Sequence, residues 1–254
     1  MNSKLSRLVA TTQIFGPFWT LQALFAVAVG KIPGMTKLSD KLTPEGYAER
    51  ARFDRRYGLD TVGFDWSVVK TFDDELGEAA QGYEGANRRH ILRVVESVPD
   101  TGPDTQFWDL GSGKGKAVFV AAMTGRFGKL VGVELGEYLV EAARKNTPIF
   151  KEKTGITTEI EWHHQSATEI EFPTDAPLVF FMYNPFIGDV FTEMMAILET
   201  HSKASSHPVH LVYAYPVCRD ELEDRPGWTE LFRQEIYPFY FDWIVYRLPG
   251  PDQA

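Results

Sequence analysis

A glycine-rich segment, DLGSGKG, carries the clearest chemical signal in this sequence of 254 residues. Asp109 opens it at the end of an apolar run, and Gly111, Gly113 and Gly115 follow at alternate positions. Glycines at this spacing let the backbone turn sharply and approach a ligand, with the N–H groups of a following helix facing it. Glu134 ends the next apolar run, nineteen residues after Gly115, where a carboxylate can accept hydrogen bonds from both hydroxyls of a ribose. The two features together predict a site for an adenosine-containing cofactor.

The same segment departs from the dinucleotide-binding pattern G-x-G-x-x-G. Lys116 stands where the third glycine of that pattern would pack helix against strand. A buried carboxylate at Asp109 suits a cationic ligand and is out of place beside a pyrophosphate. The residues therefore favour a cationic cofactor, and an NAD(P)-dependent oxidoreductase is the alternative enzyme class.

The elements that must position this loop alternate between strands and helices from residue 85 onward. Most of the strands are wholly apolar, which is typical of a parallel sheet covered by helices on both faces. The predicted strands are 106–111, 129–135, 158–165, 176–184, 208–217, 230–237 and 241–248, and the predicted helices are 85–97, 115–125, 137–155, 189–201 and, upstream, Thr43 to Gly58. The predicted fold class is α/β: a Rossmann-like, doubly wound, mostly parallel seven-stranded sheet with an antiparallel C-terminal edge hairpin and an N-terminal helical extension. Residues 238–240 separate the two strands of that hairpin.

Two segments, DLGSGKGKAVFVAA and VGVELGEYLVEAARKN, resemble the class I S-adenosylmethionine-dependent methyltransferases, and the resemblance extends over roughly residues 80–250. It implies S-adenosyl-L-methionine as the cofactor. The residues that it assigns to the methionine part and the ribose are Asp109, Gly111, Ser112, Gly113, Gly115 and Glu134. After the third strand the family usually has an acid near the adenine. Gln165 and Ser166 stand there in this chain and are the candidates for that contact.

The segment Tyr183-Asn184-Pro185-Phe186 follows the fourth strand, where the family places its acceptor-facing motif. It is similar to the N-P-P-[YF] motif of nitrogen-methylating members but is one proline short. The resemblance implies that Asn184, flanked by Tyr183 and Pro185, lies at the methyl acceptor and also borders the cofactor. An in-line displacement at a sulfonium methyl needs positioning more than acid–base chemistry. We expect Asn184 to orient an amine lone pair, which favours nitrogen over oxygen as the accepting atom.

The upstream segment GYEGANRRHILRVV is similar to an uncharacterised prokaryotic branch of the family, which itself resembles small protein-lysine methyltransferases and the Dot-type histone methyltransferases. In those relatives the residues before this helix close over the cofactor. The resemblance implies that role for Tyr83 and Glu84. From the residues alone, a packed Tyr83 and a surface Glu84 are an equal alternative.

Charge divides the chain into two parts. Residues 1–60 hold nine Lys and Arg against five Asp and Glu, whereas the whole chain has a net charge of −9. The acidic balance argues against a general nucleic-acid binder, which needs a concentrated basic surface. It is compatible with a cationic cofactor and with a basic protein side chain as methyl acceptor, and a small-molecule acceptor fits equally well. A single cysteine, Cys218, excludes an internal disulfide and a Cys-rich zinc site, and we expect no catalytic metal.

The N-terminal extension, residues 1–80, precedes the predicted methyltransferase domain, residues 81–254. Residues 8–30 contain no charged side chain and are interrupted by Gly16-Pro17. Four interpretations are open: a lid over the site, an interfacial helix, a membrane-spanning anchor and a cleaved signal peptide. The single cysteine favours a cytoplasmic setting, and if residues 8–30 span a membrane, the lysines after them favour a body attached to its inner face. The alternative outside the enzymes is a membrane-tethered, non-catalytic cofactor-binding module.

Overall fold

The computed structural model describes residues 52–62, 64–65, 83–84, 86–236 and 241–251, together with the single positions Leu21, Phe25, Ala28 and Ile32. The chain divides into two compact units, residues 1–53 and residues 54–254. Among the described residues, no helix is long and apolar enough to cross a membrane.

Several expectations fall outside the described residues. They concern nearly all of residues 8–30, the predicted helix start at Thr43 and the hairpin turn at residues 238–240. The predicted domain boundary between residues 80 and 81 also stays a prediction, because residues 66–82 are not described.

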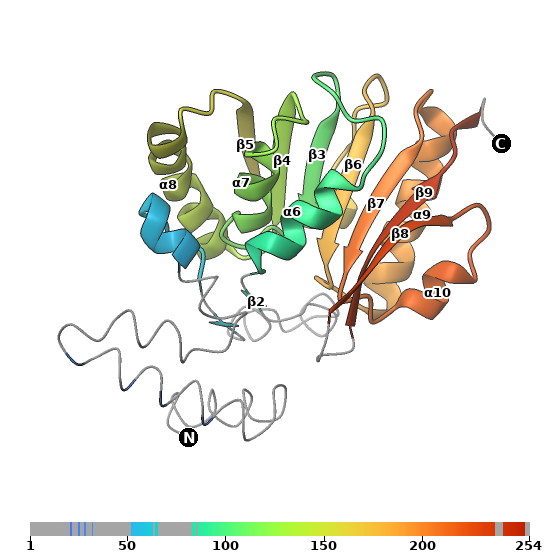
Figure 1. The fold of residues 1–254 in the computed structure, drawn as a ribbon. Helices are drawn as coiled ribbons and strands as arrows, with labels where there is room; N and C mark the ends of the chain where they lie inside the picture. Colours follow the sequence, from blue (N-terminus) through green and yellow to red (C-terminus); the bar gives the residue numbers. More distant parts are fainter. Residues whose placement is uncertain are drawn as a thin grey trace. The chain divides into compact units, whose positions relative to one another are not determined.

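The second unit contains a seven-stranded sheet in the order β5-β4-β3-β6-β7-β9-β8 (Figure 1). Its strands are β3 (Gln106–Leu110), β4 (Lys129–Glu134), β5 (Glu159–His164), β6 (Leu178–Tyr183), β7 (Val209–Ala214), β8 (Thr229–Ile236) and β9 (Phe241–Leu248). The first five of the order run parallel, and β9 is antiparallel to both β7 and β8. The predicted fold class is confirmed, including the antiparallel hairpin at one edge.

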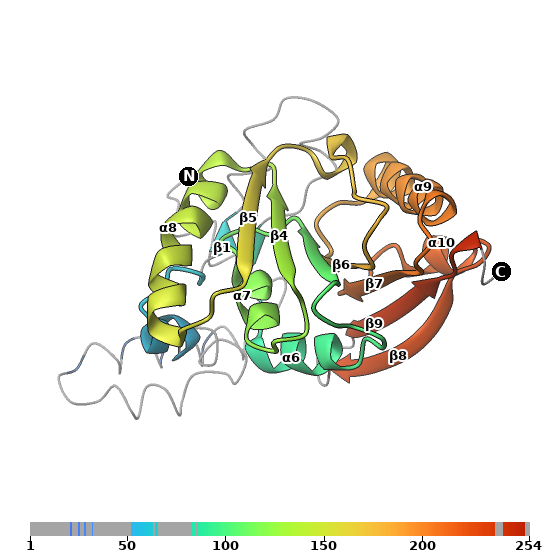
Figure 2. The same ribbon diagram turned by 90° about the horizontal axis from the view of Figure 1, so that it is seen from above.

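Helices cover both faces of the sheet (Figure 2). α6 (Arg88–Glu96), α7 (Lys116–Ala122) and α8 (Glu137–Thr154) lie on one face, and α9 (Gly188–Ala204) lies on the other. All four match predicted helices. The structure adds elements too short to give a periodic sequence signal. These are α10 (Arg219–Glu223), the 3-10 turn η1 (Ala167–Glu169), and the paired two-residue strands β1 (Phe64–Asp65) and β2 (Tyr83–Glu84).

Local signals explain where these helices begin and end. The Asn87 side chain accepts a hydrogen bond from the Arg89 N–H at 2.9 Å and so caps the start of α6. α8 ends at Gly155, whose φ of +72° is the left-handed conformation that glycine adopts most readily. Gly58, with a φ of +71°, ends the helical residues 52–57 in the same way, which confirms the predicted end of that helix.

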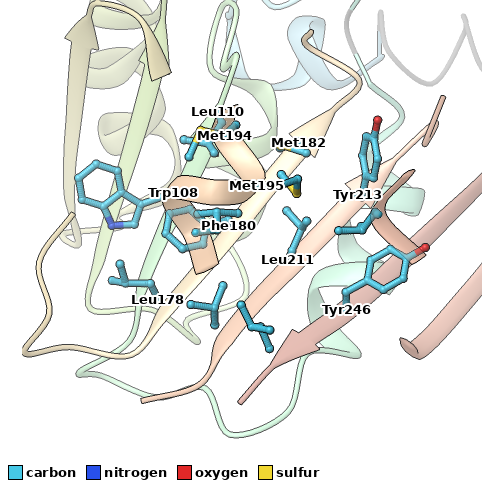
Figure 3. Close-up of a cluster of buried hydrophobic side chains, with 14 of the residues drawn as sticks. Trp108, Leu110, Leu178, Phe180, Met182, Met194, Met195, Leu211, Tyr213 and Tyr246 are labelled. Atoms are coloured by element: carbon cyan, nitrogen blue, oxygen red, sulfur yellow. The ribbon is translucent and has the colours of Figure 1, made fainter. Parts of the chain in front are cut away.

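A hydrophobic cluster fills the space between the sheet and α9 (Figure 3). Alternate residues of three adjacent strands point to this side of the sheet. They are Trp108, Leu110, Phe180, Met182, Leu211 and Tyr213, and Met194 and Met195 belong to α9. Because interiors packed in this way resist deformation, the cluster fixes the positions of the strand ends that carry the candidate site.

Candidate cofactor and active site

The glycine loop joins β3 to α7 at the carboxyl end of the parallel strands. Gly111, Gly113 and Gly115 have φ values of +86°, +53° and +87°, so all three occupy the left-handed region that a side chain disfavours. The N–H groups of Gly111 and Ser112 both donate to the Val133 carbonyl, at 2.8 and 2.9 Å. These bonds fold the loop back over the end of β4, at the edge where sheets of this type bind ligands.

Glu134 fixes the loop from the end of β4. Its Oε2 accepts from the Gly113 N–H at 2.8 Å, and its Oε1 accepts from the Gly136 N–H at 2.7 Å. Burial raises the pKa of this carboxyl, and the Gly136 and Gly113 amides act in the opposite direction because they stabilise its ionised form. A carboxylate has about four lone-pair sites, so Glu134 can hold both amides and still accept from ligand hydroxyls.

Asp109, at the end of β3, is the second acid of this site and is 2% exposed. Its pKa lies well above the ordinary value, first because of desolvation and second because of the nearby Glu134 carboxylate. Two buried acids repel each other when both are ionised. A bound cation relieves this repulsion, whereas a pyrophosphate increases it. The charge of the site therefore fits a cationic cofactor.

The segment after β6 meets the glycine loop directly. Asn184 is buried and has a φ of +42°, a left-handed conformation that asparagine tolerates better than most residues. A Cβ added at Gly111 would overlap the Pro185 side chain, so only glycine fits at that position. The contact brings the predicted acceptor-facing motif against the predicted cofactor loop.

Two buried polar atoms in these segments have no hydrogen-bond partner, Asn184 Oδ1 and Ser112 Oγ. An unpaired buried group costs about 1–3 kcal/mol, so atoms of this kind mark places where a ligand can supply the partner. Ser112 Oγ faces Gly132 of β4, where an added Cβ would lie 2.8 Å from it. Asn184 Oδ1 therefore fits the role of a ligand contact better than Ser112 Oγ.

Trp162 of β5 supports the loop, a role that the sequence analysis missed. A Cβ added at Gly115 or at Gly132 would overlap its indole ring, so both positions are glycine because of close packing. The indole N–H donates to Thr147 Oγ1 of α8 at 2.8 Å and so holds the ring in place. The one sequence signal is Gly132 inside an apolar strand, because a strand glycine often marks a close approach.

Tyr215, directly after β7, is a second residue that the sequence analysis missed. β6 and β7 are adjacent and parallel, with Tyr183 opposite Ala214, so Tyr215 lies beside Asn184 at the carboxyl edge. Asn184 and Tyr215 both have positive φ values, +42° and +52°, and both precede a proline. A residue before proline normally avoids this conformation, and such strain concentrates at functional sites. The usable sequence signal is Asn-Pro after one strand and Tyr-Pro after the next.

Gln165 and Ser166 follow β5, as the resemblance requires. The Gln165 N–H donates to the Glu134 carbonyl at 3.2 Å, which places this residue next to the acid predicted to hold the ribose. Ser166 Oγ accepts from the Thr168 N–H at 3.3 Å and caps η1. The hydroxyl of Ser166 thus has a local role, and the adenine contact of both residues stays a prediction.

Tyr183 and the pair Tyr83 and Glu84 complete the predicted set. The Tyr183 ring packs against Trp243 of β9, with 5.4 Å between ring centroids, so it buttresses the end of β6. Tyr83 and Glu84 form β2, but their side chains lie outside the described part of the structure. Their role over the cofactor stays a prediction.

The family described as histone methylation protein DOT1 matches residues 80–172. That range contains the glycine loop, Asp109 and Glu134. No curated protein matches the sequence.

Solved structures resemble the fold at low sequence identity. A protein described as a predicted N6-adenine-specific DNA methylase from Listeria monocytogenes is 15% identical over 70% of this chain and 55% of that chain, with a TM-score of 0.48. An rRNA methylase from Streptococcus thermophilus is 11% identical over 64% of this chain and 93% of that chain, with a TM-score of 0.42. A protein in the NADB-Rossmann superfamily from Streptococcus agalactiae is 12% identical over 65% of this chain and 70% of that chain, with a TM-score of 0.46. Scores of this size carry no information about the substrate.

The family match bears directly on the described site, because it spans the loop and both buried acids. The sheet independently has the predicted seven strands, mostly parallel, with the antiparallel hairpin at one edge. The two buried acids beside the loop suit a cation better than the pyrophosphate of a dinucleotide. The match over residues 80–172 and the sheet topology agree with the resemblance to the class I methyltransferases.

Proposed function

We propose that the protein transfers a methyl group from S-adenosylmethionine to a nitrogen atom, with a protein lysine side chain as the acceptor. The observation that carries the proposal is the buried Asn184 carbonyl oxygen, which has no partner and belongs to the segment in contact with the glycine loop. An amide oxygen in this place can accept a hydrogen bond from an amine and orient its lone pair. The description of the matching family as a histone methylation protein supports a protein acceptor.

The residues present fit S-adenosylmethionine by charge and by hydrogen-bonding capacity. Asp109 and Glu134 are buried acids with raised pKa values, and a cation beside them stabilises their ionised forms. Glu134 keeps acceptor capacity for ribose hydroxyls after it has bound the Gly113 and Gly136 amides. When bound, this cofactor supplies an electrophilic methyl group on a sulfonium.

The chain's own residues act by positioning. The glycine loop and Glu134 would hold the methyl donor, and Asn184 would orient the acceptor nitrogen towards it. Transfer would form one N–C bond at the expense of the donor's C–S bond, and solvent would take the amine proton. Positioning of this kind can remove about 7–11 kcal/mol from a barrier. Tyr215, 43% exposed and beside Asn184, offers a ring against which an aliphatic lysine stem can pack.

Calorimetric titration with S-adenosylmethionine and with NADH tests the cofactor. We expect binding of S-adenosylmethionine with a Kd below about 1 mM, which corresponds to about −4 kcal/mol, and no binding of NADH. Binding of NADH alone would overturn the proposal in favour of the oxidoreductase alternative.

A second experiment tests the acceptor. Purified protein is incubated with cell extract and methyl-labelled S-adenosylmethionine, and labelled products are separated into proteins, nucleic acids and small molecules. We expect label on protein lysines with the wild type, a loss of about 100-fold with Asn184→Ala, and no loss with the exposed control Thr200→Ala. Label only in nucleic acids or small molecules would exclude the lysine acceptor, and no label at all would favour the non-catalytic module.

We propose separately that residues 1–53 contact a membrane surface. Leu21, Phe25 and Ala28 are helical, and their spacing places them on one helix face, with Leu21 70% and Phe25 60% exposed. The excess of Lys and Arg in residues 1–60 complements anionic headgroups. In flotation with phosphatidylserine-containing vesicles, we expect the wild-type protein to float with the vesicles and Phe25→Glu to remain in the unbound fraction. Equal recovery of both proteins would contradict this contact.

A further inference from the structure

Residues 54–62, here named the strap, have a fixed conformation of their own. The Asp54 carboxylate accepts hydrogen bonds from the N–H groups of Thr61 and Val62, at 2.6 and 2.7 Å. The Tyr57 ring packs edge-on against Phe150 of α8, with 6.4 Å between ring centroids. Figures 1 and 2 show the helical end of the strap lying next to α8. The strap is thus an ordered segment upstream of the residues that match the family.

One buried amide joins the strap, the glycine loop and α8. Asn146 of α8 is 3% exposed. Its Oδ1 accepts from the Asp60 N–H at 3.0 Å, and its Nδ2 donates to the Asp60 carbonyl at 2.9 Å and to the Lys114 carbonyl at 3.3 Å. Lys114 lies inside the glycine loop, between Gly113 and Gly115. A single side chain therefore ties the backbone of the strap to the backbone of the loop.

An ion pair adds a second link between the same two segments. Lys114 Nζ lies 2.9 Å from Asp60 Oδ1 and 3.0 Å from Asp60 Oδ2. The Asp60 side chain is 69% exposed, and pairs this exposed contribute little to stability. The buried amide of Asn146 is therefore the stronger of the two links.

The strap leads directly into β1. Phe64 lies opposite Glu84 and Asp65 lies opposite Tyr83, in antiparallel register. Phe64 follows Asp60 by four residues, which span at most about 14 Å when fully extended. The attachment of the strap to the glycine loop therefore limits where β2 can lie. β2 is the strand formed by the two residues expected to cover the cofactor.

We propose that Asn146 is a positioning residue for cofactor binding: it locks the strap onto the glycine loop and thereby holds β1 and β2 beside the cofactor site. This inference rests on the proposed function. When the lock is lost, the loop and the strap separate for part of the time. The apparent cofactor Kd then rises in proportion as the binding-competent fraction falls.

The test compares Asn146→Asp with the wild-type full chain. The substitution keeps the side-chain size but replaces the donor that faces the Asp60 and Lys114 carbonyls with a carboxylate oxygen. We expect faster amide hydrogen exchange at residues 60–62 without cofactor, and a Kd for S-adenosylmethionine raised about tenfold in calorimetry. Asn146→Ala, which adds no charge, should change both quantities in the same direction and covers the case in which Asn146→Asp does not fold.

Leu198→Ala in α9 is the matched control. Leu198 is fully buried in the cluster on the opposite face of the sheet, so its truncation lowers thermal stability without touching the strap or the loop. We expect it to leave exchange at residues 60–62 and the cofactor Kd within about twofold of wild type. A general loss of stability is thereby separated from a loss of positioning.

The outcomes are distinguishable. Faster exchange with an unchanged Kd in the Asn146 variants would mean that the strap is only a structural support, and would overturn the inference. Unchanged exchange at residues 60–62 would show that Asn146 does not hold the strap on the glycine loop. A wild type that binds no S-adenosylmethionine would overturn the proposed function and, with it, the role in cofactor binding. Exchange at residues 60–62 would still decide whether Asn146 locks the strap.

Discussion

The half of the sheet formed by β3, β4 and β5, the loop half, holds its site residues differently from the half formed by β6, β7, β9 and β8, the hairpin half. In the loop half, left-handed positions are occupied by Gly111, Gly113 and Gly115. In the hairpin half, the left-handed positions at the strand ends are occupied by Asn184 and Tyr215. Glycine adopts this conformation without strain, so the loop half has a recognisable motif, whereas the strain in the hairpin half depends on tertiary packing.

The two halves also differ in the charge that these buried groups carry when they are ionised. Asp109 and Glu134 in the loop half are acids whose pKa values are raised, mainly by desolvation. His210 in the hairpin half has its pKa lowered to about 4, first by desolvation and second by Arg247. In both halves burial favours the neutral form, but the resulting dependence on pH is opposite.

The largest expected effect comes from Gly111→Ala, which breaks the contact between the halves. The new Cβ would overlap Pro185 at a φ of +86°, so we expect a loss of about 3 kcal/mol in the free energy of unfolding in urea. Gly125→Ala is the control, because Gly125 also has a positive φ but nothing lies within 4 Å of its added Cβ. It should lose about 1 kcal/mol. Equal losses of stability in the two variants would contradict the close contact between Gly111 and Pro185.

Glu134→Gln tests the loop half alone. Glutamine keeps one acceptor oxygen but turns an amide NH₂ towards the Gly113 or the Gly136 N–H, and it removes the charge beside Asp109. We expect a rise of about 100-fold in the S-adenosylmethionine Kd by calorimetry, about 2.7 kcal/mol. Glu137→Gln, at an exposed neighbouring position, should bind S-adenosylmethionine with wild-type affinity. A Glu134→Gln protein with wild-type affinity would reduce Glu134 to a purely structural role.

The raised pKa of Asp109 predicts how stability depends on pH. A carboxyl whose folded pKa is raised stabilises the apoprotein fully below its unfolded pKa of about 4, and this contribution is lost as pH rises through the folded pKa. A cationic cofactor favours the ionised form, so the difference in Tm between bound and apo protein should widen as the pH rises above about 4. Asp109→Asn should remove the widening. A constant difference in the wild type would argue against a cation beside Asp109.

In the hairpin half, the lowered pKa of His210 predicts a smaller dependence of stability on pH, in the opposite direction from that of Asp109. Its pKa of about 4 in the folded protein lies below the unfolded value of about 6.5, so the unfolded chain takes up the proton first. Stability contributed by the neutral ring is lost as pH falls below about 6.5. His210→Gln should flatten this decline in thermal unfolding between about pH 5 and pH 7. If thermal stability still declines at low pH in His210→Gln, a group other than His210 causes the decline.

Prediction from sequence succeeded where a signal is local. The glycine loop, Glu134 at the end of the following strand and the end of α8 at Gly155 all follow from residues near each other in the chain. It missed Trp162 and Tyr215, whose roles depend on neighbours from other strands and helices. Packing against a distant glycine leaves no periodic mark in the tryptophan's own segment, and a residue–proline pair after a strand does not by itself reveal a left-handed backbone.

The sequence by itself determined the fold class and the positions of the loop and both acids, because apolar periodicity and glycine spacing encode them over a few residues. Only the tertiary structure decided that Glu134 holds the Gly113 amide and that Pro185 touches Gly111. It also decided that Asn146 ties the strap to the loop through Asp60, 86 residues apart in the chain. Contacts at such separations are set by how the elements pack, and a buried amide is satisfied only by whichever backbone groups the packing brings to it.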